Sequence, residues 1–474
     1  MRRSSTIAIP HACLRAVFLL ALAASLPAGA LADERFVGHW EGEIQTPGQA
    51  LAVKVDLALD GGVWSGTIDI PAQGAKGLAL GGLEVAGDRV TFSIAGVPGD
   101  PKFTGVLAGG EIAGDFTQGP ATIPFRLGRE VAPPPPRPQE PKPPYPYLVE
   151  EVTYRNGEVT LAGTLTLPVG DGPFVAAVLV TGSGAQNRDE ELLGHKPFLV
   201  LADHLTRQGI AVLRSDDRGV GGSSGSVSEA TSSDFADDAL AAIERLRQDS
   251  RIDPGKIGII GHSEGGLVGP LAASRSSSVA FVVMLAGPGV SGAEILPHQL
   301  AKILSANGVG EEAVARQVEI QRELIAAVIA EQPRERLQEI GRRLVELQSG
   351  GQLTGEQLEQ TVDQALAGLT TPWFRYFVAH DPRPVLARLE VPVLALNGEL
   401  DLQVDPAQNL PPIEQALAGK AGTVVRELAG LNHLFQHATA GSPGEYAQIE
   451  ETFAPEALAA ISDFILERFA QRAR

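Results

Sequence analysis

Apolar residues follow two different patterns along this chain, and the change comes near Tyr147. From residue 34 to about residue 130, short runs such as Arg89–Ile94 alternate between apolar and polar residues, and glycine-bearing turns separate them. Alternation with a period of two is typical of antiparallel strands with one buried face. The pattern predicts a small all-β domain over residues 33–130, built as a closed or half-closed meander. Trp40 and Trp64 are expected in its core, with a ligand platform as the alternative.

Beyond residue 147, continuous apolar runs alternate with segments of helical period. Short apolar runs indicate buried parallel strands, and their alternation with helices indicates a sheet covered by helices. The predicted strands include Phe174–Val180, Ile210–Arg214, Lys256–Ile260, Ala280–Leu285 and Val391–Leu396, and the predicted helices include Phe198–Gln208, Phe235–Gln248 and Pro455–Arg472. The pattern predicts an α/β domain over residues 147–474.

One segment, at about residues 292–369, interrupts this alternation. It is charged and carries apolar residues at three- and four-residue spacing, notably over 311–331 and 333–348. That spacing predicts amphipathic helices, and no strand pattern accompanies it. We expect a helical cap that covers a pocket of the sheet, the alternative being a solvated bundle with no gating role.

The N-terminal segment and the segment between the two domains have distinct compositions. Residues 1–32 combine Arg2, Arg3 and Arg15 with an apolar stretch from Ala16 to Ala28 and end in a small-x-small site before Asp33. This pattern predicts a signal peptide and an exported chain, periplasmic or secreted, with an uncleaved anchor as the alternative. Residues 131–146 are rich in proline, which predicts an extended, semi-rigid linker.

Charge and cysteine content exclude several classes of function. The net charge of −19 argues against partners such as nucleic acid or an anionic membrane. The only cysteine, Cys13, lies within the predicted signal peptide, so we expect no disulfide in the mature chain.

No cofactor motif is present, because Asn187 and Ser224 stand where two glycine-rich loops would need glycine to bind a dinucleotide. No glutamate follows His433, so the zinc pattern His-Glu-x-x-His fails as well.

The sequence Gly261-His262-Ser263-Glu264-Gly265 fits the G-x-S-x-G pattern of a nucleophile elbow. A predicted strand precedes it, and a stretch of small apolar residues that suits a packed helix follows it. A sharp strand-to-helix turn presents the central side chain at the helix N-terminus, where free N–H groups stabilise negative charge. Ser263 is therefore the predicted nucleophile.

A serine nucleophile needs a base, and the base needs an acid that orients it. His433 lies in a loop between the last predicted strand and the last helix and is the predicted base, with His437 as the alternative. Asp401 follows the strand Val391–Leu396 and is the predicted acid, with Glu399 and Asp405 as alternatives. All three predicted groups lie beyond strand ends, in the chain order Ser, Asp, His.

The predicted oxyanion hole combines the N–H of Glu264 with one from the loop after the strand Phe174–Val180. Ser183 is the first candidate for that donor and Gly184 the second. The polar run over residues 186–190 on the same loop has two interpretations: it binds polar substrate groups, or it forms an ion-pair cluster at the surface.

The α/β part resembles the α/β-hydrolase superfamily, and within it exported bacterial serine esterases with this elbow. The resemblance rests on the elbow, the loop over 181–190 and the Asp-x-Arg-Gly-x-Gly-x-Ser loop over 216–223, with Ser215 where the family often has an aromatic residue. It implies hydrolysis of small or medium acyl esters through an acyl-enzyme, with a small-molecule ester as substrate. An exported serine peptidase of the same fold and a non-catalytic cell-surface binding protein are the alternatives. The natural substrate and the oligomeric state stay open.

Overall fold

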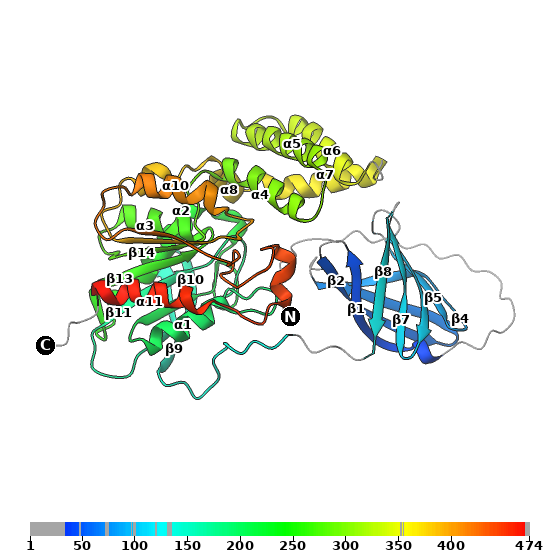
Figure 1. Cartoon of the computed structure of the whole chain (residues 1–474), viewed down its shortest axis with the longest axis horizontal. Coiled ribbons are helices and arrows are strands. Elements are labelled where there is room, and N and C mark those ends of the chain that lie inside the picture. The colour runs from blue at the N-terminus through cyan, green and yellow to red at the C-terminus, as the bar shows by residue number, and fades with distance from the viewer. Residues whose placement is uncertain are drawn as a thin grey trace, which may run out of the picture.

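The computed structural model describes residues 34–469, except 47–48, 72–74, 96, 98–100, 119–120, 130–134, 351–352 and 354. The predicted signal peptide lies outside these residues. Figure 1 shows two β structures in the chain, an all-β unit in blue and cyan and a larger unit of strands and helices. Among the described residues, no helix is both long enough and apolar enough to cross a membrane.

The N-terminal unit is a closed barrel of antiparallel strands joined in chain order. The closure follows from pairing of the first strand with the last, for example Ile44 with Phe125. Its interior is filled by side chains: Phe92 stacks on Phe103 with ring centroids 4.7 Å apart, and the indole of buried Trp40 donates to the carbonyl of Phe36 at 2.8 Å. Trp40 is therefore a core residue as predicted, and half-buried Trp64 packs against the same core. The strands are β1 (Gly38–Thr46), β2 (Gln49–Asp60), β3 (Val63–Ile70), β4 (Ala75–Ala86), β5 (Arg89–Ile94), β6 (Lys102–Ala108), β7 (Glu111–Gln118) and β8 (Ala121–Gly128), and the short helix η1 (Glu34–Phe36) precedes them.

The second unit is built on an eight-stranded sheet with the order β16-β15-β14-β13-β11-β12-β10-β9. The strands β11 to β16 pair in parallel, while β9 and β10 form a hairpin that adds antiparallel strands at one edge. Buried apolar runs form these strands, as the continuous patterns predicted. The strands are β9 (Leu148–Asn156), β10 (Val159–Leu167), β11 (Phe174–Val180), β12 (Ala211–Ser215), β13 (Ile252–His262), β14 (Val282–Leu285), β15 (Val393–Gly398) and β16 (Val424–Leu428).

Helices cover both faces of this sheet, and each face has its own apolar core. Helices α1 (Pro197–Arg207) and α11 (Pro455–Phe469) pack on one face. Helices α2 (Ser232–Arg247), α3 (Gly265–Arg275), α9 (Arg383–Leu386) and α10 (Pro406–Ala416) pack on the other. Figure 1 shows α2, α3 and α10 above the sheet and α1 and α11 below it. Short helices η3 (Val227–Glu229) and η4 (Pro443–Gln448) lie in loops.

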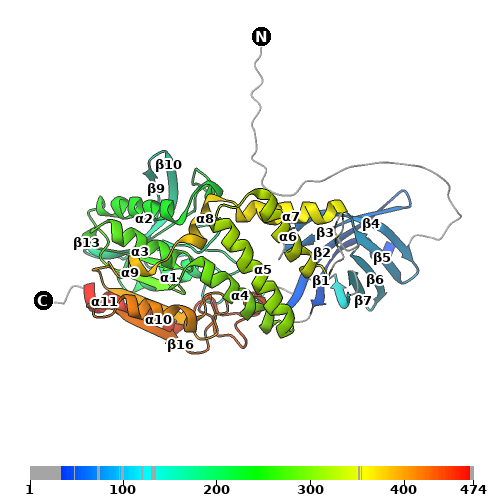
Figure 2. The ribbon, with the colours of Figure 1, turned by 90° about the horizontal axis from the view of Figure 1, so that it is seen from above.

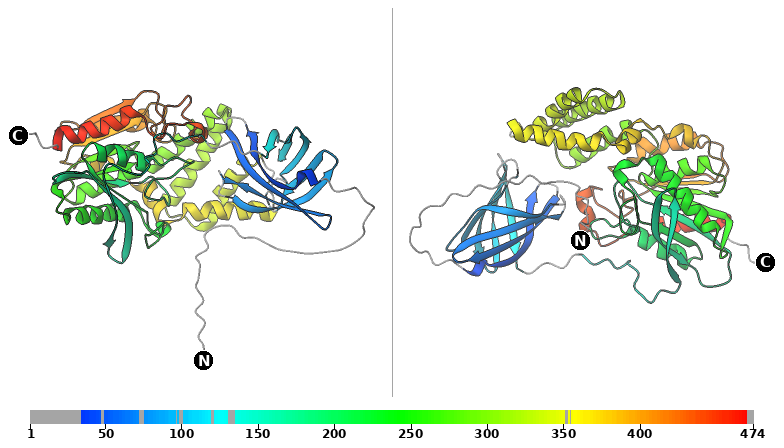
Figure 3. Two further views of the ribbon diagram at one scale, coloured as in Figure 1. Left: turned by 90° about the horizontal axis from the view of Figure 1, so that it is seen from below. Right: turned by 180° about the vertical axis from the view of Figure 1, so that it is seen from behind.

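The predicted helical cap is inserted between β14 and β15. It consists of α4 (Gly292–Ala306), α5 (Glu311–Ile329), α6 (Arg334–Gln348), α7 (Gly355–Leu369) and α8 (Pro372–Ala379). Its apolar residues, among them Val328, Ile340 and Val362, form a core of their own. Figure 2 shows these helices from above, with α8 over the α/β unit and α6 and α7 extending beyond its edge, and Figure 3 shows them from below and from behind.

The proline-rich segment differs from the extended spacer that its composition predicts. In its described part, residues 135–146, Arg137 and Gln139 donate hydrogen bonds to backbone carbonyls of the α/β unit. Arg137 and Gln139 stand on either side of Pro138, and their side chains make these contacts. Composition alone does not reveal such docking, because the partners lie more than 300 residues away along the chain.

Candidate active site

The sheet order places a crevice at the carboxyl ends of β11 and β13. From β11 the chain crosses through α1 to β12 on one side, and from β13 it crosses through α3 to β14 on the other. Ligands of open α/β sheets bind at such a switch point, where neighbouring connections run in opposite directions. The loop after β11 carries Ser183, and the turn after β13 carries Ser263.

The turn from β13 into α3 has the geometry of the predicted elbow. Ser263 has φ of 52°, in the left-handed region that is strained for a residue with a side chain. Glycine is required on either side of it. A Cβ on Gly261 would overlap the backbone of Gly265, and one on Gly265 would overlap the carbonyl of Val180. The N–H of Ser263 donates to the carbonyl of Leu285 at 2.8 Å, which fixes the turn against the neighbouring strand.

Ser263 and His433 both line one cavity of about 300 Å³ beneath the cap. Its apolar wall comes mainly from the cap, through Ile295, Leu296, Trp373 and Phe377. Its polar wall includes three neutral amides, and the rest of the lining comes from loops after β11, β13, β15 and β16. The amides belong to Gln186, Gln299 and Gln403. The only ionisable side chains in the lining are those of Glu190, His262 and His433.

His433 and Asp401 form a buried pair. The Nδ1 atom of His433 lies 2.8 Å from Oδ2 of Asp401, and their exposed fractions are 4% and 2%. The other carboxylate oxygen of Asp401 accepts the N–H groups of Gln403 and Val404 at 2.8 and 2.9 Å. These donors fix the orientation of the Asp401 side chain, and His433 keeps Nε2 for another partner.

The alternative acids and the alternative base lie elsewhere. His437 is exposed and pairs with Glu451 and Glu456. Asp405 caps helix α10 and pairs with His298 and Lys302 of the cap helix α4. Exposed Glu399 accepts the N–H of Gly430 at 2.8 Å. None of these three alternatives lines the cavity of Ser263 in the part of the chain that the structure describes.

Of the candidate oxyanion donors, Ser183 and Glu264 have unused backbone N–H groups. Among the described hydrogen bonds, neither N–H has an acceptor. The adjacent N–H of Gly182 is not available, because it donates to Oε1 of Glu190 at 2.8 Å. Gly184 has φ of 106° and lines a smaller hollow beside Asp217 rather than the cavity of Ser263. The geometry therefore favours Ser183 over Gly184.

Carboxylates behind the loop after β11 hold it in place. Asp217 accepts the hydroxyl of Thr181 and the N–H of Gln186, each at 2.9 Å. These two contacts bracket Ser183, and Glu190 binds the N–H of Gly182 between them. Fixed donors cost little reorganisation when charge develops on a substrate, so this arrangement suits an oxyanion site.

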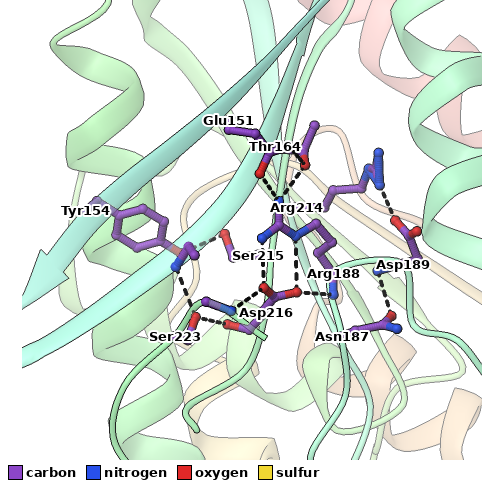
Figure 4. Close-up of polar contacts among 12 residues, drawn as sticks. Glu151, Tyr154, Thr164, Asn187, Arg188, Asp189, Arg214, Ser215, Asp216 and Ser223 are labelled. Atoms are coloured by element: carbon purple, nitrogen blue, oxygen red, sulfur yellow. Dashed lines mark hydrogen bonds and ion pairs between the residues drawn. The ribbon is translucent and has the colours of Figure 1, made fainter. Parts of the chain in front are cut away.

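In the polar run over residues 186–190, Arg188 and Asp189 form ion pairs with residues elsewhere in the α/β unit. Figure 4 shows Arg188 between Asp216 and Glu151, and Asp189 facing Arg214. Arg188 donates to both oxygens of Asp216, at 3.1 and 2.7 Å. Figure 4 also shows Tyr154 beside Ser215, whose hydroxyl accepts a hydrogen bond from that of Tyr154 at 2.9 Å. Among the two interpretations, the ion-pair cluster is the one that the contacts support, although part of it is buried rather than at the surface.

Two buried residues next to Ser263 have roles that the sequence did not reveal. The Glu264 carboxylate accepts hydrogen bonds from Ser232 at 2.6 Å and from the indole of Trp373 at 2.8 and 2.9 Å. Burial raises the pKa of Glu264. Because Trp373 belongs to the cap and lines the cavity, Glu264 connects the elbow to the apolar wall.

His262 lies at the edge of the cavity, between two acceptors. Its Nδ1 is 2.9 Å from Oε1 of Glu190, and its Nε2 is 3.0 Å from the carbonyl of His433. Burial alone would lower the pKa of His262, but the Glu190 carboxylate raises it above its ordinary value. A ring with acceptors at both nitrogens is satisfied as an imidazolium, which supports the His433 loop from below.

We expect Asp217 to make stability depend on pH. Burial raises the pKa of Asp217 from its ordinary value of 3.8 to about 7, so the folded state binds its proton more tightly than the unfolded state. The free energy of unfolding should therefore fall as pH rises through the window between those values. In urea denaturation, the Asp217→Asn variant should gain stability relative to the unaltered chain between pH 5 and pH 8. Asp171→Asn, at an exposed residue, is the control, and a difference that does not change with pH would contradict the assignment.

Within the described ranges, no group of three or more His, Cys, Asp or Glu residues could hold a metal ion. The arrangement can instead support nucleophilic chemistry, since it combines a strained serine, a buried imidazole–carboxylate pair and two free N–H groups at one cavity.

Comparisons with known proteins find similar sequences for the α/β part of the chain. A family described as serine aminopeptidase, S33, matches residues 196–345, which include the elbow and much of the cap but neither Asp401 nor His433. The esterase EstD of Thermotoga maritima is 27% identical over 292 residues, which cover 61% of this chain and 62% of that protein. This chain thus spans less than two thirds of that relative's length.

Solved structures with a similar arrangement include an esterase, Pf2001, of Pyrococcus furiosus and an α/β hydrolase, GrgF, of Penicillium. Pf2001 is 15% identical with a TM-score of 0.41, and the match covers 69% of this chain and 94% of that one. GrgF is 18% identical with a TM-score of 0.42, and the match covers 69% and 100%. These TM-scores are too low to carry an argument about function.

Proposed function

We propose that this chain, whose C-terminal part belongs to the α/β-hydrolase superfamily, is a serine hydrolase that acts as a carboxylesterase on small or medium acyl esters. The observation that carries the proposal is the pair of His433 and Asp401, 2.8 Å apart, at the cavity that Ser263 lines from a left-handed turn. A serine without such a base is weakly nucleophilic at neutral pH.

In the proposed reaction, Ser263 attacks the ester carbonyl while Nε2 of His433 takes the hydroxyl proton. Asp401 holds Nδ1 protonated and stabilises the imidazolium. The N–H groups of Glu264 and Ser183 donate to the oxyanion of the tetrahedral intermediate. His433 then returns the proton to the leaving alcohol, and water releases the acyl group from Ser263 by the same steps in reverse order.

The lining of the cavity supports an uncharged acyl group. Trp373 and Phe377 stack 5.5 Å apart and, with Ile295 and Leu296, form an apolar surface of the kind that binds an alkyl or aryl chain. A volume of about 300 Å³ lies at the lower end of small-molecule pockets, which suits small or medium acyl groups.

A peptidase is the second candidate, because the matching family is described as a serine aminopeptidase. An aminopeptidase needs a carboxylate for the ammonium group of its substrate, and Asp189 and Glu190 are the acidic pair on the loop after β11. Asp189 pairs with Arg214, and both hydrogen-bond partners of Glu190 Oε1 are internal. Burying an ammonium group without a free partner costs several kcal/mol.

We therefore expect esters to be hydrolysed faster than aminoacyl anilides. The measurement compares kcat/KM for p-nitrophenyl esters of rising acyl length with that for the p-nitroanilides of alanine and of propionate. The two anilides form a matched pair that differs in the ammonium group, and that group should bring no gain. Turnover of the alanine anilide above that of the best ester would shift the assignment to a peptidase.

A further inference from the structure

The proline-rich segment before the α/β unit forms hydrogen bonds with two loops of that unit that lie far apart in the sequence. Arg137 donates to the carbonyls of Leu193 and Gly194, each at 3.3 Å, and to those of Ala447 and Ile449, each at 2.8 Å. One guanidinium thus joins the loop over residues 190–196 to the segment over residues 443–453. Only arginine carries enough donors in a rigid fork to bind four carbonyls in this way.

Gln139, two residues after Arg137, also binds the segment over residues 443–453. Its Oε1 accepts the N–H groups of Thr452 and Phe453, at 2.6 and 3.0 Å, and its amide donates to the carbonyl of Phe453 at 2.6 Å. This pairing fixes the backbone of residues 452–453 as a neighbouring strand would. Arg137 and Gln139 together form what we name the strap.

The first loop that the strap holds reaches the cavity directly. Leu192 lines the cavity, and Glu190 both lines it and binds the N–H of Gly182. Buried His195 connects this loop to the second segment, with Nε2 2.8 Å from the carbonyl of Tyr446 and Nδ1 2.9 Å from the hydroxyl of Thr452. A shift of either segment therefore displaces groups that hold the oxyanion loop.

The second segment supports the loop of the base. Phe453 stacks on Phe435 with ring centroids 5.6 Å apart, and the N–H of Ala454 donates to the carbonyl of Phe435 at 2.8 Å. Phe435, two residues after His433, has φ of 61° and so depends on its surroundings to keep that conformation.

The same segment also supports the acid. The hydroxyl of Tyr446 lies 3.1 Å from the amide of Gln403, whose own N–H donates to Asp401 at 2.8 Å. The contacts of Gln139 thus lead through Phe453 and Phe435 to the loop of His433. Those of Arg137 lead through the segment of Tyr446 and then Gln403 to Asp401.

We propose that the strap positions the catalytic pair: Arg137 and Gln139 are positioning residues that hold the loops of His433 and Asp401 in register with Ser263. This inference rests on the proposed hydrolase function. The proline-rich segment is then part of the catalytic unit rather than a spacer, and its prolines keep the two gripping side chains at a fixed separation. Displacement of catalytic groups by about 1 Å lowers the rate roughly a hundredfold, so loss of the strap should act on kcat.

The test uses full-length chains that carry Arg137→Ala with Gln139→Ala, each single substitution, and Arg137→Lys. Lys142→Ala is the matched control, since Lys142 lies in the same segment, is exposed and makes no hydrogen bond or ion pair within the described residues. The readouts are kcat and KM for the best p-nitrophenyl ester, the rate at which a phosphonate labels Ser263, and the melting temperature.

We expect the double variant to lose about 10- to 100-fold in kcat and in the labelling rate, with KM changed by less than about threefold. Arg137→Lys should fall between the double variant and the control, because an ammonium group reaches fewer carbonyls. Unchanged kcat and labelling in folded variants, with only a lower melting temperature, would overturn the proposal. If the double variant does not fold, the two single variants and Arg137→Lys decide in the same way.

Failure of the hydrolase assignment itself would look different. The unaltered chain would then turn over no ester and would not be labelled at Ser263, whatever residue stands at 137 or 139.

Discussion

Replacing Ser263 with alanine should lower kcat for ester hydrolysis by roughly 10⁴- to 10⁶-fold, because no acyl-enzyme can then form. The hydroxyl of Ser263 makes no hydrogen bond within the described residues, so its removal leaves no buried group unpaired. The neighbouring turn depends on glycines and on the N–H of Ser263, which alanine retains. The free energy of unfolding should therefore stay within about 0.5 kcal/mol of its original value.

The measurement is the hydrolysis of p-nitrophenyl esters by purified Ser263→Ala, with urea denaturation to establish that the fold is kept. Ser274→Ala is the matched control, since this exposed serine lies on the helix that follows the elbow. Full activity in Ser263→Ala would place the nucleophile elsewhere. An unaltered chain that neither turns over esters nor reacts with a phosphonate would favour the non-catalytic binding protein.

Replacing Asp401 with asparagine should lower kcat roughly 10⁴-fold, the loss expected when the orienting acid becomes an amide. The asparagine oxygen can still accept the N–H groups of Gln403 and Val404, so the loop should keep its shape. Its amide group would then face Nδ1 of His433 and favour the tautomer with the proton on Nε2. In that tautomer the imidazole cannot take the proton of Ser263.

Glu399→Gln is the matched control for this prediction, because it makes the same chemical change in a neighbouring exposed acid that lies outside the cavity lining. Its kcat should stay within about twofold, as for surface substitutions in general. Equal losses in the two variants would mean that Asp401 has no special relation to His433. A loss confined to Glu399→Gln would move the acid to that residue.

Most of the fold was predictable because hydrophobic period and turn residues are local properties. The predicted parallel sheet, the helices on both faces, the helical cap and the all-β N-terminal unit are confirmed. The strand predicted at Ala280–Leu285 starts two residues later, at Val282, and the one predicted at Lys256–Ile260 is longer at both ends, from Ile252 to His262. Such shifts at element ends reflect pairing with neighbouring strands, which the sequence does not show.

The candidate site was predictable to the extent that each residue stands in a local context. Ser263 has glycines around it, and Asp401 and His433 each follow a strand. The structure brings Asp401 and His433 into contact and places His433 and Ser263 at one cavity. Their roles stay predictions until the substitutions are measured.

The contacts that support this site have no local pattern. Glu264 with Trp373, Glu190 with His262, and Arg137 with Ala447 join residues separated by 109, 72 and 310 positions. From the sequence alone, Glu264 in the elbow and Arg137 among the prolines cannot be distinguished from ordinary surface polar residues, because their partners are unknown. Chain folding brings these partners together, and burial then makes their pairing strong.

By itself, the amino-acid sequence determined the period of each element, the sharp turn at Ser263 and the chain order of the predicted nucleophile, acid and base. Tertiary structure decided which acid meets His433, which N–H groups remain free beside Ser263, and that the carboxylates of residues 189 and 190 are already paired. It also decided that the proline-rich segment grips the loops of the site. The physical reason is that periodicity and turn conformation depend on neighbours along the chain, whereas hydrogen-bond partners and burial depend on neighbours in space.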